Sequence, residues 1–127
     1  MSKYFSLSIS VFLILFSSFS CLDEDEISFF IEGDYSGTFE RNGEQGKVEI
    51  TFSNGTFEGT SEKVKFPALC NGTYTLTPKE ITFQNECPWT AEFDWTLILN
   101  GKWEYQQNAN ELVLENELGD RYELSKK

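Results

Sequence analysis

The chain has 127 residues, with 21 acidic and 10 basic side chains, a formal net charge of −11 at pH 7 and no histidine. Its length allows one small domain, and its negative charge repels nucleic-acid phosphates, so we expect neither DNA nor RNA as a partner. The lack of histidine removes the commonest general base, the commonest metal ligand and every histidine-activated nucleophile. We therefore expect no metal, no other cofactor and no catalytic residues.

Residues 1–20 have the layout of a secretory signal peptide. Lys3 supplies a basic start, and residues 4–19 are apolar or serine and carry no charge. Cys21 follows, and Leu22 separates it from four consecutive acids. These acids are Asp23, Glu24, Asp25 and Glu26. This order predicts an exported protein whose mature chain begins at the cysteine.

The segment Ser18-Phe19-Ser20-Cys21 resembles a bacterial lipobox, in which a small residue precedes the cysteine that is acylated. The acidic run resembles the surface-export signal of Bacteroidota-type lipoproteins, which lies a residue or two after that cysteine. The resemblance implies an outer-membrane protein that is lipid-anchored at Cys21 and exposed on the cell surface. Residues 21–32 would then form an acylated, acidic tether.

Two other interpretations of this segment stay open. Ser18 and Ser20 also suit an ordinary signal peptidase, which would yield a secreted or periplasmic protein without a lipid. The segment could instead remain as an uncleaved transmembrane helix, although it is shorter than the roughly 20 predominantly apolar residues that a span needs.

The three cysteines predict one disulfide. If the first is acylated, Cys70 and Cys87 remain as a pair in an exported, oxidising environment. A hairpin centred on residues 78–79 sets Tyr74 opposite Phe83 and, continued outward, sets the two cysteines opposite each other. A bridge that encloses roughly 15 residues contributes about 3 kcal/mol to stability.

From Gly33 onward apolar and polar residues alternate, which predicts antiparallel strands throughout residues 33–127. Four Asn-Gly dipeptides mark turns, and a two-residue turn at the second of them sets Phe52 opposite Phe57. Eight or nine short strands are expected, joined by short links. They predict an all-β, up-and-down meander that closes into a small barrel, because closure removes exposed sheet edges.

The hairpin expected near Asn100-Gly101 needs a three-residue turn. This turn sets Leu97 opposite Trp103, which keeps both side chains on one face of the sheet. Residues 93–99 are therefore predicted to be a strand, with Trp95 facing inward and Ile98 facing outward.

The segment Gly33-Asp34-Tyr35-Ser36-Gly37-Thr38-Phe39 resembles the opening strand of lipocalin-like barrels, with tyrosine where tryptophan is usual. The segment Cys70-Asn71-Gly72-Thr73-Tyr74 resembles the META family of small exported β domains. The lipocalin-like resemblance implies a small hydrophobic ligand in the barrel mouth. The many large inward side chains, about half of them aromatic, favour a filled interior instead.

Trp89 interrupts the alternation, in Cys87-Pro88-Trp89-Thr90. It is interpreted either as an exposed aromatic platform for a glycan or a partner protein, or as a plug over one barrel end. An enzyme would have to use carboxylates, and Glu92 and Asp94 on one outward face would both stay solvated, so no enzyme is expected.

These observations predict a membrane-anchored lipoprotein whose barrel is a non-enzymatic binding module for an unknown envelope protein or glycan. The alternative is a lipocalin-like carrier of a small hydrophobic ligand.

Overall fold

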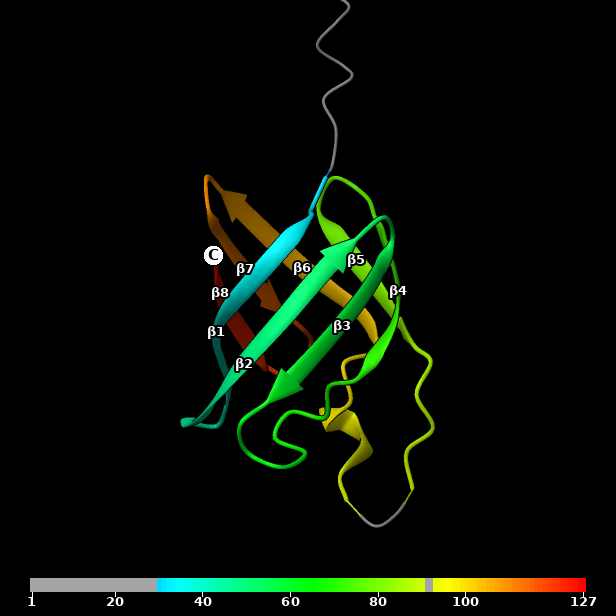
Figure 1. Cartoon of the computed structure of the whole chain (residues 1–127). Coiled ribbons are helices and arrows are strands. Elements are labelled where there is room, and N and C mark those ends of the chain that lie inside the picture. Colours follow the sequence, from blue (N-terminus) through cyan, green and yellow to red (C-terminus); the bar gives the residue numbers. More distant parts are fainter. Residues whose placement is uncertain (1–29, 91–92) are drawn as a thin grey trace, which may run out of the picture.

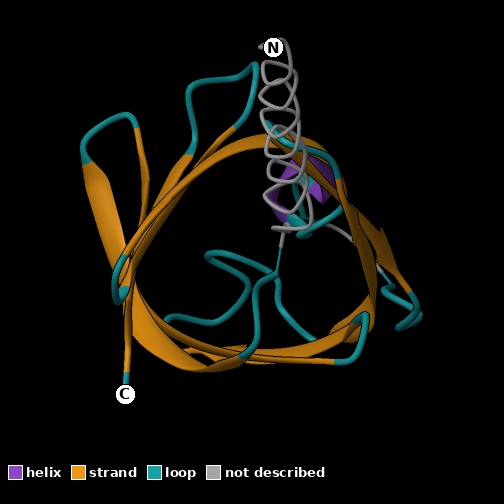
Figure 2. Ribbon diagram, turned by 90° about the horizontal axis from the view of Figure 1, so that it is seen from above, coloured by secondary structure: helices purple, strands orange, loops and turns teal. Residues whose placement is uncertain are grey.

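The computed structural model describes residues 30–90 and 93–127. Eight antiparallel strands form a closed barrel, in which each strand pairs with its neighbours in sequence and the last pairs with the first (Figures 1 and 2). The strands are β1 Gly33–Arg41, β2 Glu44–Ser53, β3 Thr56–Ser61, β4 Asn71–Leu76, β5 Glu80–Asn85, β6 Gly101–Asn108, β7 Glu111–Glu115 and β8 Arg121–Lys126. The predicted all-β meander and its closure into a small barrel are confirmed.

The signal peptide, Cys21 and the acidic residues Asp23, Glu24, Asp25 and Glu26 lie outside the described residues. Their assignments stay predictions. In the part of the chain that the structure describes, no helix has the length and apolar character that crossing a membrane requires.

The alternation of the sequence places apolar side chains inside the barrel, as in β2, where buried and exposed residues alternate along the strand. Aromatic rings form much of the core. Phe52 lies edge-on to Tyr74, with ring centroids 5.2 Å apart, and Tyr122 packs against Phe39 and Trp103 at 5.0 and 5.2 Å. These contacts fill the interior with side chains, since rings at such distances leave no room for a ligand between them.

Two predicted hairpins have the register that the sequence indicated. Phe52 pairs with Phe57 across the turn at Asn54-Gly55, and Tyr74 pairs with Phe83 between β4 and β5. The turn at Asn42-Gly43 joins β1 to β2 directly. Two-residue turns of Asn and Gly accept the positive φ that such hairpins need, with φ of 49° and 83° at residues 54 and 55.

The prediction of a strand at residues 93–99 is wrong. The connections between strands were expected to be short, and the one between β5 and β6 is long. Trp95–Leu97 form the short 3₁₀ helix η3, and β5 pairs directly with β6, so that Ile81 faces Trp103. Trp95 is 55% exposed instead of inward, and Ile98 is buried instead of outward.

The physical reason lies in a local hydrogen-bond pattern. The Asp94 carboxylate accepts a hydrogen bond from the backbone N–H of Thr96 at 3.0 Å and another from its hydroxyl at 2.6 Å. Such side-chain bonds to nearby groups stabilise a turn and compete with the ladder of a sheet. The segment therefore leaves the barrel wall and forms part of a long connection between β5 and β6.

Candidate functional site

The two ends of the barrel have different structures. We call the end where residue 30 lies the proximal end. The opposite end, where residues 62–70, 86–90 and 93–100 lie, is the distal end (Figure 1). At the proximal end, Ile31 is buried and its carbonyl accepts a 2.6 Å hydrogen bond from the Tyr74 hydroxyl. A single residue of the entering chain thus covers part of this end.

Two long connections cover the distal end. They meet in a parallel bridge between Ala68 and Ile98, where the Ala68 N–H donates to the Leu97 carbonyl at 2.9 Å and the Leu99 N–H donates to the Ala68 carbonyl at 3.2 Å. Ala68, Leu69, Ile98 and Leu99 are buried by this pairing. These aliphatic residues, together with Phe66, which packs on Phe39 with ring centroids 5.3 Å apart, therefore cover the distal end, and Trp89 does not.

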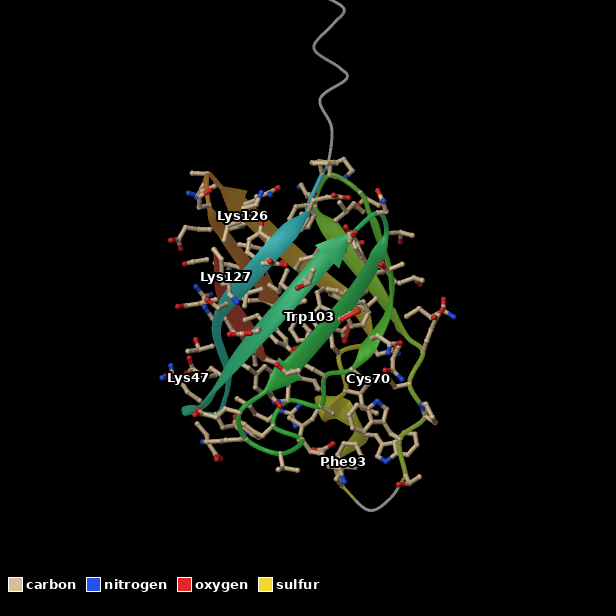
Figure 3. The ribbon with its side chains drawn as sticks, in the orientation of Figure 1. Lys47, Cys70, Phe93, Trp103, Lys126 and Lys127 are labelled. Atoms are coloured by element: carbon tan, nitrogen blue, oxygen red, sulfur yellow. A yellow bond between two sulfur atoms is a disulfide. The ribbon has the colours of Figure 1, made fainter. Side chains whose placement is uncertain are left out.

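The predicted disulfide is confirmed. Cys70 and Cys87 are bonded, with their Cα atoms 6.1 Å apart, just beyond the paired part of the β4–β5 hairpin. Beyond the last strand pair, the Glu86 N–H still donates to the Asn71 carbonyl at 2.9 Å. The disulfide therefore links the start of the connection that follows β5 to the residue that precedes β4. Cys70 is labelled in Figure 3.

The side chain of Asn85 holds Trp89 in place. Its Nδ2 donates to the Cys87 carbonyl at 2.8 Å, and its Oδ1 accepts a hydrogen bond of 3.2 Å from the Trp89 indole Nε1. The half-buried Trp89 ring also packs edge-on against Phe93, with centroids 5.7 Å apart. Trp89 does not belong to the hydrophobic core cluster. It lies on the distal surface in a fixed orientation.

A hollow of about 430 Å³ lies beside this ring, and we call it the aromatic hollow. Its lining combines two indole side chains with two amides and carries no charged side chain. The lining residues are Asn85, Cys87, Pro88, Trp89, Trp95, Ile98 and Asn100. The arrangement can stack a flat or ring-shaped group and hydrogen-bond to its polar edge.

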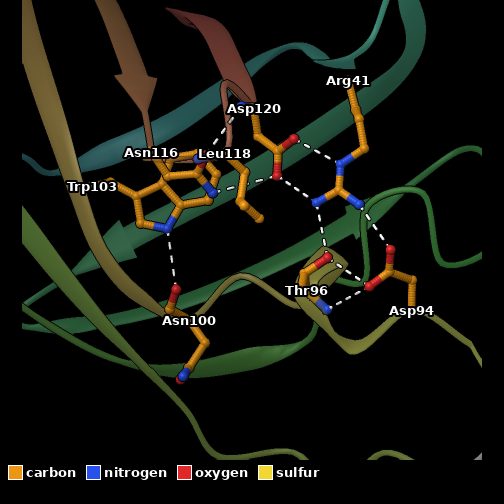
Figure 4. Close-up of polar contacts among 8 residues, drawn as sticks. All are labelled: Arg41, Asp94, Thr96, Asn100, Trp103, Asn116, Leu118 and Asp120. Carbon is orange, nitrogen blue, oxygen red and sulfur yellow. Dashed lines mark hydrogen bonds and ion pairs between the residues drawn. The ribbon is translucent and has the colours of Figure 1, made fainter.

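A charged network positions the η3 side of this hollow (Figure 4). The Arg41 guanidinium donates two 2.7 Å hydrogen bonds to the buried Asp120 carboxylate, a 3.0 Å bond to Asp94 and another to the Thr96 hydroxyl. The bonds to Asp120 raise the pKa of Arg41, and the bonds from Thr96 lower the pKa of Asp94. The network links the end of β1, the β7–β8 connection and η3.

This network has the character of a structural support, because its charges are used in bonds to one another. Asp94, one half of the carboxylate pair considered from the sequence, is committed to Arg41 and Thr96, and Glu92 lies outside the described residues. Within residues 30–90 and 93–127, no group of three or more Cys, Asp or Glu side chains could hold a metal ion.

Sequence reasoning identified Trp89 and the disulfide but missed Trp95, Asn85 and Asn100. The spacing of Asp94 and Thr96 is a capping pattern that could have indicated an irregular segment and hence an exposed Trp95. No local signal marks the two asparagines, because they meet only through folding. The Asn85 N–H donates to the Asn100 Oδ1 at 2.7 Å, across 15 residues of chain.

Comparisons of the sequence with protein-family models and with curated proteins, and of the fold with solved structures, found no match. The fold alone defines its class. It is a small, closed, eight-stranded antiparallel barrel of an architecture compatible with lipocalin-like barrels and consistent with a binding module.

Proposed function

We propose that this protein is a surface-exposed lipoprotein, held by acyl chains on Cys21, whose barrel is a non-enzymatic binding module for an envelope protein or a glycan. The observation that carries the binding role is the aromatic hollow. It is an uncharged concave surface with two tryptophans in its lining, on a molecule whose surface is otherwise rich in charged side chains. Exposed aromatic residues held in rigid positions are typical of binding surfaces.

The position of the hollow supports this role. The chain enters at the proximal end, while Trp89 and Trp95 belong to the distal connection (Figure 1). A tether that leads from a membrane to the proximal end would leave the distal end facing outward. The barrel would thereby present the aromatic hollow to the surroundings of the cell.

The disulfide supports the lipid anchor indirectly. Because Cys70 and Cys87 are bonded to each other, acylation would account for Cys21, the third cysteine of the chain. One acyl chain binds a membrane only marginally, and two or more hold a protein firmly, at about 0.8 kcal/mol for each buried methylene. The acidic run that follows Cys21 resembles an export signal, and its charges would favour a hydrated tether.

Detergent partitioning tests the anchor. The wild-type protein should enter the detergent phase, and Cys21→Ala should move it to the aqueous phase, because the substitution removes the acylation site. Replacing residues 23–26 with alanines should leave the protein in the detergent phase but reduce its digestion by protease added to whole cells. A wild-type protein that stays in the aqueous phase would contradict the proposal and favour an ordinary secreted protein.

A further inference from the structure

The aromatic hollow differs from four other hollows of the described surface in the charge of its lining. Each of the others contains at least three charged side chains, as in the hollow of about 710 Å³ over β1, β2 and β3, which Lys47, Glu49 and Glu62 help to line. The aromatic hollow contains none. An ionic group would lose hydration there without gaining a partner, so the hollow selects uncharged ligands.

Two indole faces are available in this hollow. Trp95 is 55% exposed, and its ring lies 6.1 Å from that of Phe93. Lys65 Nζ lies 4.9 Å from the centroid of the Phe93 ring and so occupies a face of that ring. Trp89 and Trp95 are therefore the rings on which a ligand can stack. The negative face of an indole attracts the weakly positive C–H groups of a saturated ring.

Asn100 supplies a polar contact beside these rings. Its Oδ1 accepts the 2.7 Å bond from the Asn85 N–H, and its backbone carbonyl accepts a 3.2 Å bond from the Trp103 indole. Within the described residues, its Nδ2 has no protein partner, and its exposed amide points away from Trp103 (Figure 4). Nδ2 can therefore donate to a ligand oxygen.

The hollow is also preorganised. The disulfide and the Asn85 side chain hold Trp89, and the bonds from Arg41 to Asp94 and Thr96 hold η3, the element that carries Trp95. Side chains that are already fixed lose little conformational entropy when a ligand binds. This matters most for ligands that make weak individual contacts.

We infer that the aromatic hollow binds an uncharged carbohydrate, whose ring stacks on Trp95 or Trp89 and whose hydroxyl accepts a hydrogen bond from Asn100 Nδ2. A sugar matches the combination of flat apolar faces, amide groups and no charge, and a hollow of about 430 Å³ lies within the usual range for small-ligand sites. A protein partner buries roughly 800 Å² of its own surface, so it would also need contacts outside the hollow, whereas a sugar needs none. The inference rests on the proposed function, because it names the ligand class for the same surface.

Calorimetric titration of the detergent-solubilised full chain with maltohexaose, cellohexaose, xylohexaose and mannohexaose tests the inference. At least one should bind, and Trp95→Ala should weaken its binding at least tenfold. Asn100→Asp keeps the Oδ1 acceptor for Asn85 but replaces the Nδ2 donor, so it should weaken binding with little change in melting temperature. Val64→Ala is the matched control, because Val64 is 85% exposed in the other distal connection and lies outside the hollow.

Three results would overturn the inference. In the first, none of the four oligosaccharides binds at millimolar concentration. In the second, Trp95→Ala leaves the affinity unchanged. In the third, Val64→Ala weakens binding as much as Trp95→Ala does. If an envelope protein bound the wild type and lost binding in Trp95→Ala while the sugars did not bind, the sugar assignment would fail and the proposed function would stand. An aqueous wild-type protein in the partitioning experiment would instead defeat the lipoprotein and leave the sugar site intact.

Discussion

At the scale of single residues, Tyr122 combines complete burial with an unsatisfied hydroxyl. The residue is 0% exposed, and its Oη has no hydrogen-bond partner among the described residues. A buried polar group without a partner costs about 1–3 kcal/mol. We therefore expect Tyr122→Phe to raise the free energy of unfolding by about 1 kcal/mol at pH 7, measured by urea denaturation. A loss of stability would show that the hydroxyl is satisfied in solution.

The same residue predicts a pH dependence. Burial raises the pKa of Tyr122 well above 10 in the folded protein, whereas the unfolded chain keeps a value of about 10. The folding stability is therefore constant with respect to this group below about pH 10 and decreases as the pH rises toward the folded pKa, because the unfolded state loses its proton first. Tyr122→Phe should lose less stability than wild type between pH 9 and about 11. Burial also raises the pKa of Tyr35, Tyr74 and Tyr105, so part of the loss should remain.

At the scale of elements, the disulfide and the hairpin that it closes form one unit. The bridge joins residues 17 positions apart, a loop for which chain entropy predicts about 3 kcal/mol of stabilisation. Replacing Cys70 and Cys87 together with alanine should lower the free energy of unfolding by about that amount, measured by denaturation without reductant. A change below about 0.5 kcal/mol would mean that the strand pairs alone determine the stability of this end.

The β4–β5 hairpin was predictable because its register depends on neighbouring residues alone. Tyr74 and Phe83 must share a face, and that requirement sets the distance from the turn to each cysteine. The filled interior was predictable for a similar reason. The alternation of apolar and polar residues indicates which side chains face inward, and many of these side chains are large. Local rules therefore predicted the barrel wall and one half of the candidate site.

Residues 93–99 were not predictable in this way. Their alternation suits a strand, but Asp94 bonds to Thr96 and to Arg41, which lies 53 residues away in the chain. The bond to Thr96 corresponds to a local capping pattern, but the bond to Arg41 leaves no trace in the alternation of apolar and polar residues. Trp95 was therefore assigned to the core although it is exposed, and Asn100 was assigned to a hairpin turn although it lines the aromatic hollow.

At the scale of the whole molecule, the filled barrel predicts that apolar ligands do not bind. Five hollows on the described residues lie on the outside of the barrel or at its distal end. A ligand stabilises a folded protein only if it binds to it. Palmitate or another fatty acid should therefore leave the melting temperature unchanged. A large upward shift, with a change in Trp103 fluorescence, would establish the hydrophobic-ligand carrier in place of the interaction module.

Closure of the barrel between β1 and β8 also determines how the domain bears force. A pull between the start of β1, at Gly33, and a ligand held by the distal connections acts along the strands. β1 pairs with β2 from Gly33 to Arg41 and with β8 from Tyr35 to Glu40, and ladder bonds run perpendicular to the strands. Such a pull loads these bonds together in shear instead of opening them one at a time. The domain therefore has the geometry of a mechanically resistant coupling between its two ends.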